Sequence, residues 1–127
     1  MKLLTHNMLT SKCLKNVVSG YPLQISINSP EDVKVQEVDF NPEFIARIIP
    51  KVDWDVLCKT AEEVGHKGDL PATLDQDYET NEEFLKMAHH VLLEVEVMSG
   101  ELVCPETGRR FPVTDGIPNM LLNEDEV

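Results

Sequence analysis

The segment CPETGRRFPVTDGIPNMLL, residues 104–122, decides how the fold of this chain is interpreted. It begins like a metal-binding knuckle of the form C-P-x-C-G, but Thr107 stands where the second cysteine belongs. Residues 110–113 then predict a short strand, Asp115-Gly116 predicts a turn, and the apolar run 117–122 predicts a final extended piece. Three explanations are open: a broken zinc site, a catalytic cysteine, or a surface that binds another protein.

Further β-forming segments lie at both ends of the chain. Residues 93–97 alternate apolar and polar side chains, and Ser99-Gly100 is a two-residue turn signal before residues 101–104 return. Near the start, residues 21–27 alternate in the same way, and residues 33–38 predict a second short extended piece. Leu3, Leu4, Met8 and Leu9 indicate an extended start followed by a turn or short helix. We expect the two ends to build one small sheet together.

The middle of the chain has the signals of helices. Asn41 is a good N-cap, Pro42 suits the first helical position, and Pro50 ends the helix. Asp53 can cap a second helix, and Thr80-Asn81-Glu82-Glu83 forms a capping box for a third. The fold class predicted from these patterns is therefore α+β, with an antiparallel β lobe from both termini and an inserted helical lobe.

The charge of the chain argues against nucleic-acid binding by this protein alone. Its 127 residues include 11 Lys and Arg against 23 Asp and Glu, for a net charge of −12. Proteins that grip phosphates need a basic surface, and Arg109-Arg110 is the only basic pair after the first quarter. No apolar run approaches the length of a membrane helix, and no signal-peptide core forms, so we expect an intracellular protein without membrane contact.

The cysteines do not form a recognisable site. Cys13, Cys58 and Cys104 are an odd number at wide spacing, which argues against a disulfide framework. A structural zinc site needs four ligands, usually in C-x2–4-C pairs, and Cys104 lacks its partner. Two cysteines with a histidine such as His6 stay open as an alternative, whereas the adjacent His89 and His90 face different directions on a helix.

Catalysis by this chain alone is not expected. A nucleophilic Cys104 would need a nearby base, and any of the four histidines could supply one in space, but the flanking Cys-Pro-Glu-Thr-Gly is a turn rather than a nucleophile motif. No glycine-rich loop follows a strand in a βαβ unit, so neither a dinucleotide nor an S-adenosylmethionine pocket is visible.

The supply of apolar side chains is large for so small an interior. One cluster surrounds Pro50 and includes Trp54, and a second lies at residues 120–122. Two interpretations are open: these side chains close the core, or part of them form an interface, as contiguous exposed apolar patches usually do. Residues 116–120 could also add to the sheet of a partner, although Pro118 lacks one hydrogen-bond donor.

Four stretches resemble one family: MKLLTHNML, EVDFNPEFIARIIPKVDW, NEEFLKMAHHVLLEVEV and CPETGRRFPVTDGIPNMLL. The chain is similar to the small multifunctional methyltransferase subunits, the activators shared by eukaryotic tRNA, rRNA and translation-release-factor methyltransferases. The resemblance implies a zinc-ribbon-like β lobe, residues 1–36 plus 93–127, and an inserted helical lobe, residues 37–92. It covers nearly the whole chain, with residues 10–36 and 58–80 loosely matched.

The resemblance also bears on metal binding. Some members of the family bind zinc through four cysteines, two near the N-terminus and two in the knuckle. Here only Cys104 matches; Thr107 replaces its partner, Ser11 and Asn16 fall near the N-terminal ligand positions, and Cys13 is out of step with them. We therefore expect no bound zinc, with Cys104 as a remnant ligand.

The implied function is that of a non-catalytic activator. The resemblance implies that the chain binds several Rossmann-fold methyltransferases one at a time as heterodimers, that S-adenosylmethionine is bound by the partner only, and that the protein works in the cytoplasm and nucleus. The docking residues implied by the family are Leu3, Thr5, Asn7 and Met8 from an N-terminal strand, Phe44, Ile45, Ile48, Ile49, Pro50 and Trp54 from the middle, and Gly116, Ile117, Pro118, Asn119, Met120, Leu121 and Leu122 as the pairing strand. The alternative is a freestanding zinc-ribbon-like module that binds nucleic acid or metal.

Overall fold

Helices and antiparallel strands alternate along the chain in a computed structural model that describes residues 1–68, 70–74 and 76–122. The helical elements are α1 (Leu3–Met8), α2 (Pro42–Ile48), α3 (Trp54–Glu63) and α4 (Glu82–His89), with 3-10 turns at Pro30–Asp32, Ile49–Lys51 and Tyr78–Thr80 and a π-helical turn at His90–Glu94. The strands are β1 (Gln24–Ser26), β2 (Val33–Val35), β3 (Val95–Val97), β4 (Gly100–Val103), β5 (Arg110–Thr114) and β6 (Ile117–Pro118). The predicted α+β class is confirmed.

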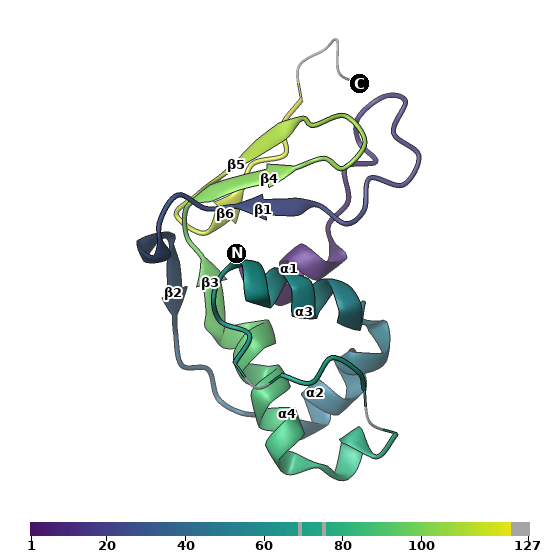
Figure 1. Ribbon diagram of the computed structural model, residues 1–127, viewed down its shortest axis with the longest axis vertical. Coiled ribbons are helices and arrows are strands. Elements are labelled where there is room, and N and C mark those ends of the chain that lie inside the picture. Colours follow the sequence, from purple (N-terminus) through teal and green to yellow (C-terminus); the bar gives the residue numbers. More distant parts are fainter. Residues whose placement is uncertain (69, 75, 123–127) are drawn as a thin grey trace.

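The largest sheet combines the two ends of the chain. Its four strands follow the order β1-β4-β5-β6 and are all antiparallel, with Ile25 opposite Leu102 and Leu102 opposite Phe111. In Figure 1 this sheet lies at one end of the molecule, above α1 and α3, while α2 and α4 lie at the other end. The strands β2 and β3 pair separately, so the expectation of one small sheet is wrong: there are two among the described residues.

The turn predicted at Ser99-Gly100 does not make a hairpin. The strands on either side, β3 and β4, belong to different sheets, and the chain passes from one sheet to the other at this point. The amides of Met98 and Ser99 both donate to the carbonyl of Asp32. A Cβ atom on Gly100 would lie 2.5 Å from the carbonyl oxygen of Ser26, so the crossing requires glycine. The strand predicted at residues 93–97 begins only at Val95, because Leu93 and Glu94 belong to the π-helical turn.

The first residues form a helix instead of the N-terminal strand that the family resemblance implied. Leu3, His6 and Asn7 in α1 are buried, at the spacing of one helical face, and α1 packs against α3. Only Lys2 keeps a strand-like bridge, to Glu96. The polar side chains of His6 and Asn7 on the buried face are hydrogen-bonded to Leu23 and Asp53, which explains why the hydrophobic pattern alone placed a turn or short helix only after an extended start.

The caps of the middle helices follow the sequence signals closely. The side chains of Asn41 and Asp53 accept from the amides of Phe44 and Val56 at the starts of α2 and α3. At α4 the cap lies one residue later than predicted, because the side chain of Asn81, not Thr80, accepts from the third amide of the helix. Local capping therefore placed the starts of all three helices to within about one residue, the usual uncertainty of helix ends.

One hydrophobic cluster connects the sheet and the helices. It includes Leu3 of α1, Ile45 of α2, Leu57 of α3, Val95 of β3 and Phe111 of β5. The division into a lobe of residues 1–36 plus 93–127 and a lobe of residues 37–92 stays a prediction. Across the residues that the structure describes, no helix is both long and apolar enough to span a bilayer.

Candidate docking surface

The strand β6 lies at the edge of the four-stranded sheet. It pairs on one side with β5, where Val113 faces Pro118 and Thr114 faces Ile117, and no described strand pairs with its other side. The amide of Asn119 donates to the carbonyl of Pro112 at 2.8 Å. Since backbone groups alternate in direction along a strand, Pro118 occupies a position whose amide would face outward. The outward side of Pro118 therefore offers a carbonyl and no donor to an added strand.

Apolar side chains are exposed along this edge. The side chains of Ile117 and Leu121 are 67% and 80% exposed, whereas Met120 and Leu122 are half-buried and pack against the core. A shallow depression of about 620 Å³ is lined by Thr114 and residues 117–121. We call these lining residues the β6 edge. An open strand edge beside uncovered apolar side chains is a typical binding site for a protein.

The turn before β6 is fixed to the rest of the fold. Asp115 and Gly116 have positive φ angles of 52° and 77°, as a tight turn between antiparallel strands requires. The amide of Gly116 donates to Met98, and its carbonyl accepts from the amino group of Met1. The β6 edge therefore begins from a well-anchored position beside the start of α1.

Several residues predicted to dock are buried, and this part of the prediction is corrected. The side chains of Leu3, Ile45 and Ile49 have no exposed surface, so a partner cannot reach them in the folded chain. The side-chain amide of Asn7 exchanges two hydrogen bonds of 2.9 Å with the backbone of Asp53. The indole of Trp54 donates to Pro71. These five predicted residues build the core and join α1 to α3.

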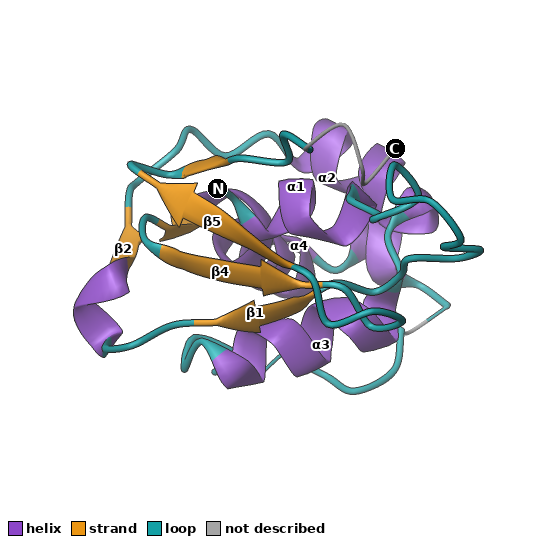
Figure 2. Cartoon of the chain, turned by 90° about the horizontal axis from the view of Figure 1, so that it is seen from above, coloured by secondary structure: helices purple, strands orange, loops and turns teal. Residues whose placement is uncertain are grey.

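The remaining predicted residues reach the surface. Thr5, Met8, Phe44 and Pro50 are exposed, and Ile48 is half-buried. Figure 2 shows α1 and α2 on the side of the molecule where the strand after β5 lies, and α3 beneath β1 on the opposite side. Three of the exposed predicted residues, Thr5, Met8 and Phe44, therefore belong to helices that lie on the same side as the strand after β5.

The residues at the implied zinc position do not fit a zinc ion. The hydroxyl of Ser11 lies 3.0 Å from Cys104 Sγ, and Cys13 is exposed. A single thiol with the hydroxyls of Ser11 and Thr107 is a poor donor set, because structural zinc sites use thiolates and imidazoles. No group of three or more His, Cys, Asp or Glu side chains capable of holding a metal occurs within the described ranges.

Burial and hydrogen bonding also characterise Cys104. Burial opposes ionisation of this thiol, but hydrogen bonds from Ser11, Thr107 and the local backbone prevail and lower its pKa. Cys104 is only 2% exposed. Among the described hydrogen bonds the thiol is not paired with a histidine, since His6 is bonded to Leu23, His89 to Val38 and His90 to Glu94. Within the part of the chain that the structure describes, no histidine is hydrogen-bonded to this thiol as the base of a Cys–His catalytic pair would be.

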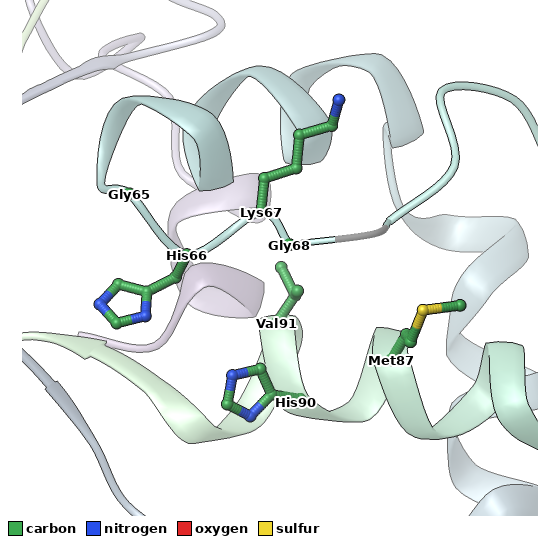
Figure 3. A pocket seen from close by; sticks show the side chains of 7 residues that line it. All are labelled: Gly65, His66, Lys67, Gly68, Met87, His90 and Val91. Carbon is green, nitrogen blue, oxygen red and sulfur yellow. The ribbon is translucent and has the colours of Figure 1, made fainter.

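A second cavity, of about 360 Å³, lies between the loop after α3 and the end of α4. Figure 3 shows the rings of His66 and His90 at the same end of this cavity, with the Lys67 side chain extending away from it. His90 is held by a 2.9 Å contact with Glu94, whose carboxylate also accepts from the amide of Val38. With two imidazoles and no third ligand among the described residues, the cavity does not make a metal centre.

Sequence reasoning missed one residue at the knuckle. We call residues 104–109 the knuckle and residues 11–20 the N-terminal loop. The carboxylate of Glu106 accepts hydrogen bonds from the amides of Val18, Ser19 and Gly20 and so ties the two segments together. The sequence signal was only a glutamate two residues after the knuckle cysteine, which is uninformative without the position of the loop.

This chain is similar to known proteins over nearly all of its length. The family described as Trm112p-like protein matches residues 2–116. The multifunctional methyltransferase subunit TRM112-like protein of Bos taurus is 49% identical over 126 residues, covering 99% of this chain and 98% of that protein. Homolog A of Arabidopsis thaliana is 49% identical over 133 residues, with 100% of both chains covered. The TRM112 subunit of Saccharomyces cerevisiae is 30% identical over 130 residues, covering 96% of each.

A solved structure supports the same fold. A chain in the E. cuniculi Mtq2–Trm112 complex, which is responsible for methylation of the translation termination factor eRF1, aligns with a TM-score of 0.52 and 15% identity. The alignment covers 95% of each chain. At this identity the likeness concerns the arrangement of helices and strands.

Proposed function

The chain belongs to the Trm112p-like family, and from this premise we propose that it is a non-catalytic subunit that binds S-adenosylmethionine-dependent methyltransferases and activates them. Its relatives in cattle and plants are named as multifunctional methyltransferase subunits. The single structural observation that supports docking is the β6 edge: a strand with one side that no described strand pairs, flanked by the exposed side chains of Ile117 and Leu121.

The chemistry resides in the partner. The buried Cys104 has no histidine partner among the described hydrogen bonds, so this chain contributes a surface rather than a reactive group. Several Rossmann-fold methyltransferases bind in turn to the same edge, each supplying the S-adenosylmethionine site, and their substrates are tRNA, rRNA and a release factor. The protein acts in the cytoplasm and nucleus. Because one edge serves all partners, each complex is a heterodimer.

Activation follows from linkage. A subunit that binds only the folded partner stabilises it by RT ln(1 + [L]/Kd), and it favours whichever partner conformation exposes the complementary strand. The added strand donates to the outward carbonyl of Pro118, while partner apolar side chains cover Ile117 and Leu121. The net charge of −12 gives no support to the alternative, autonomous nucleic-acid binding.

Co-expression with methyltransferases of the same organism tests the proposal. The wild-type chain should co-purify with each partner, raise its methylation rate and carry no RNA when purified alone. Ile117→Asp and Leu121→Asp should abolish co-purification, because each buries a charge against the partner. Val35→Asp is the matched control, since Val35 is 50% exposed but lies in β2, away from the β6 edge. If both edge variants still co-purify and activate, the docking surface lies elsewhere.

A further inference from the structure

The strongest unexplained feature outside the β6 edge is the contact between the N-terminal loop and the knuckle. Glu106 Oε2 accepts from the amides of Gly20 at 2.6 Å and Ser19 at 2.9 Å, and Oε1 accepts from Val18 at 3.2 Å. Three successive amides directed at one carboxylate form an anion-binding concavity, here filled by a side chain of the same protein. A side chain from residue 106 thus organises a loop more than eighty positions earlier in the chain.

Beneath this carboxylate, Ser11 closes the loop from the inside. Its amide donates to the carbonyl of Gly20 at 2.9 Å, and its hydroxyl lies 3.0 Å from Cys104 Sγ. Ser11 is fully buried and Cys104 nearly so. Two contacts therefore join the N-terminal loop to the knuckle: the buried Ser11–Cys104 hydrogen bond and, nearer the surface, the hydrogen bonds to Glu106.

The backbone of the N-terminal loop packs closely around Ser11. Gly20 has a positive φ of 60°, and a Cβ atom there would lie 2.6 Å from the Ser11 hydroxyl and 2.7 Å from its amide nitrogen. No other residue type allows so close an approach at that φ. On the knuckle side, the amide of Cys104 donates to Arg109, and the amide of Gly108 donates to Cys104. Both segments are thus shaped for direct contact with each other.

We propose that the Glu106 carboxylate, with the Ser11–Cys104 hydrogen bond beneath it, closes the N-terminal loop on the knuckle in place of a zinc ion. We call this pair of contacts the clamp. A zinc ion joins two such segments through thiolates about 2.3 Å from the metal. Here the Ser11 hydroxyl is hydrogen-bonded to the Cys104 thiol. The Glu106 carboxylate supplies the anionic group, and its hydrogen bonds hold the two segments together. The proposal concerns this chain alone and stands whether or not the proposed methyltransferase function holds.

The metal content and thermal unfolding of the purified chain give the first test. Zinc measured by mass spectrometry should be a small fraction of one ion per chain, and an excess of EDTA should leave the melting temperature unchanged. Near-stoichiometric zinc together with a lower melting temperature in EDTA would overturn the proposal.

Hydrogen exchange at the amides of residues 18–20 gives the second test. Glu106→Ala should raise their exchange about tenfold, and Glu106→Gln should raise it less because one acceptor oxygen remains. Glu101→Ala is the matched control: it removes a carboxylate of β4, one that contacts Arg110 at 3.2 Å, and should leave the exchange of these amides unchanged. Unchanged exchange in Glu106→Ala, with the circular-dichroism spectrum of the folded chain, would refute the clamp.

Discussion

The two ends of β5 differ in how completely their groups are satisfied within the chain. At the Arg110 end, the knuckle is closed by backbone and side-chain hydrogen bonds, and the carboxylate of Glu106 has three amide partners. At the Thr114 end, no strand among residues 1–68, 70–74 and 76–122 pairs with the outer side of β6, and the apolar side chains of Ile117 and Leu121 are exposed. One strand thus joins a region complete in itself to a region that another protein can complete.

Exposure separates core residues from candidate docking residues better than hydrophobicity does. Ile45 and Ile117 are the same residue type, but Ile45 has no exposed surface and Ile117 is 67% exposed. Burial of an apolar side chain stabilises the fold, whereas an exposed one contributes its transfer free energy only when a partner covers it. Substitutions at the two kinds of site should therefore act on different measurements: unfolding for one and association for the other.

The largest loss of stability is expected from Phe111→Ala. Phe111 is the second residue of β5, has no exposed surface and pairs with Leu102, so the substitution leaves a cavity in the core beneath the sheet. We expect the free energy of unfolding to fall by about 3–5 kcal/mol in urea denaturation. Arg110→Ala, at an exposed neighbouring position, should cost at most about 1 kcal/mol. If Phe111→Ala costs less than about 1 kcal/mol, then Phe111 does not support β5 and the two regions at its ends.

The next effect should come from Gly20→Ala, at the closed end. Its φ of 60° strains an alanine, and the new Cβ would clash with Ser11. We expect a loss of about 2–3 kcal/mol. Gly108→Ala is the matched control: its φ is 76°, but a Cβ there has nothing within 4 Å, so only the strain of about 1 kcal/mol applies. Equal melting temperatures for the two variants would contradict the tight packing of loop and knuckle.

A pH effect is expected at His6, whose ring nitrogen Nε2 contacts the carbonyl of Leu23 at 2.6 Å. Burial lowers the pKa of His6 below its usual 6.5 and outweighs the opposing contact with the Leu23 carbonyl. The unfolded chain therefore binds a proton first as the pH falls. The stability due to neutral His6 is complete above about pH 6.5 and is lost as the pH falls toward the lowered value. The midpoint of urea unfolding should be lower at pH 5.5 than at pH 7.5, and His6→Gln should reduce this difference between the two midpoints. If the difference is the same in His6→Gln as in the wild type, His6 is not its cause.

Local signals in the sequence predicted the elements better than their connections. Asn41, Asp53 and the alternation in residues 21–27 gave the helix starts and β1 because caps and two-residue periods are short-range effects. The crossing at Ser99-Gly100 was misjudged as a hairpin because a turn signal does not say which sheet the next strand joins. The start of α1 was expected to be extended, with a turn or short helix only after it, because His6 and Asn7 on the buried face of this helix are polar.

The candidate site was predictable only in part. The apolar run 117–122 suggested a surface because so small a chain has little interior in which to bury it, although closing the core stayed open as the other interpretation. Ile45 and Ile49 are equally apolar but are fully buried. Their segment packs against α4, and this tertiary contact cannot be recognised from the sequence. Glu106 could not be recognised because its three partners lie in the N-terminal loop.

The smallest effect on stability is expected at the β6 edge itself, from Ile117→Ser and Leu121→Ser. Because both side chains are mostly exposed in the free chain, their loss should change the free energy of unfolding by no more than about 0.5 kcal/mol. Ile45→Ala, the buried counterpart, should cost about 2–4 kcal/mol under the same urea titration.

The same serine variants should change association. An open strand edge with uncovered apolar side chains promotes contact between copies of a free chain, so sedimentation at high concentration should show less self-association for Ile117→Ser and Leu121→Ser than for the wild type. If instead these variants unfold as easily as Ile45→Ala, then Ile117 and Leu121 contribute to the core. The β6 edge would then be as complete in itself as the knuckle, and the contrast between the two ends of β5 would disappear.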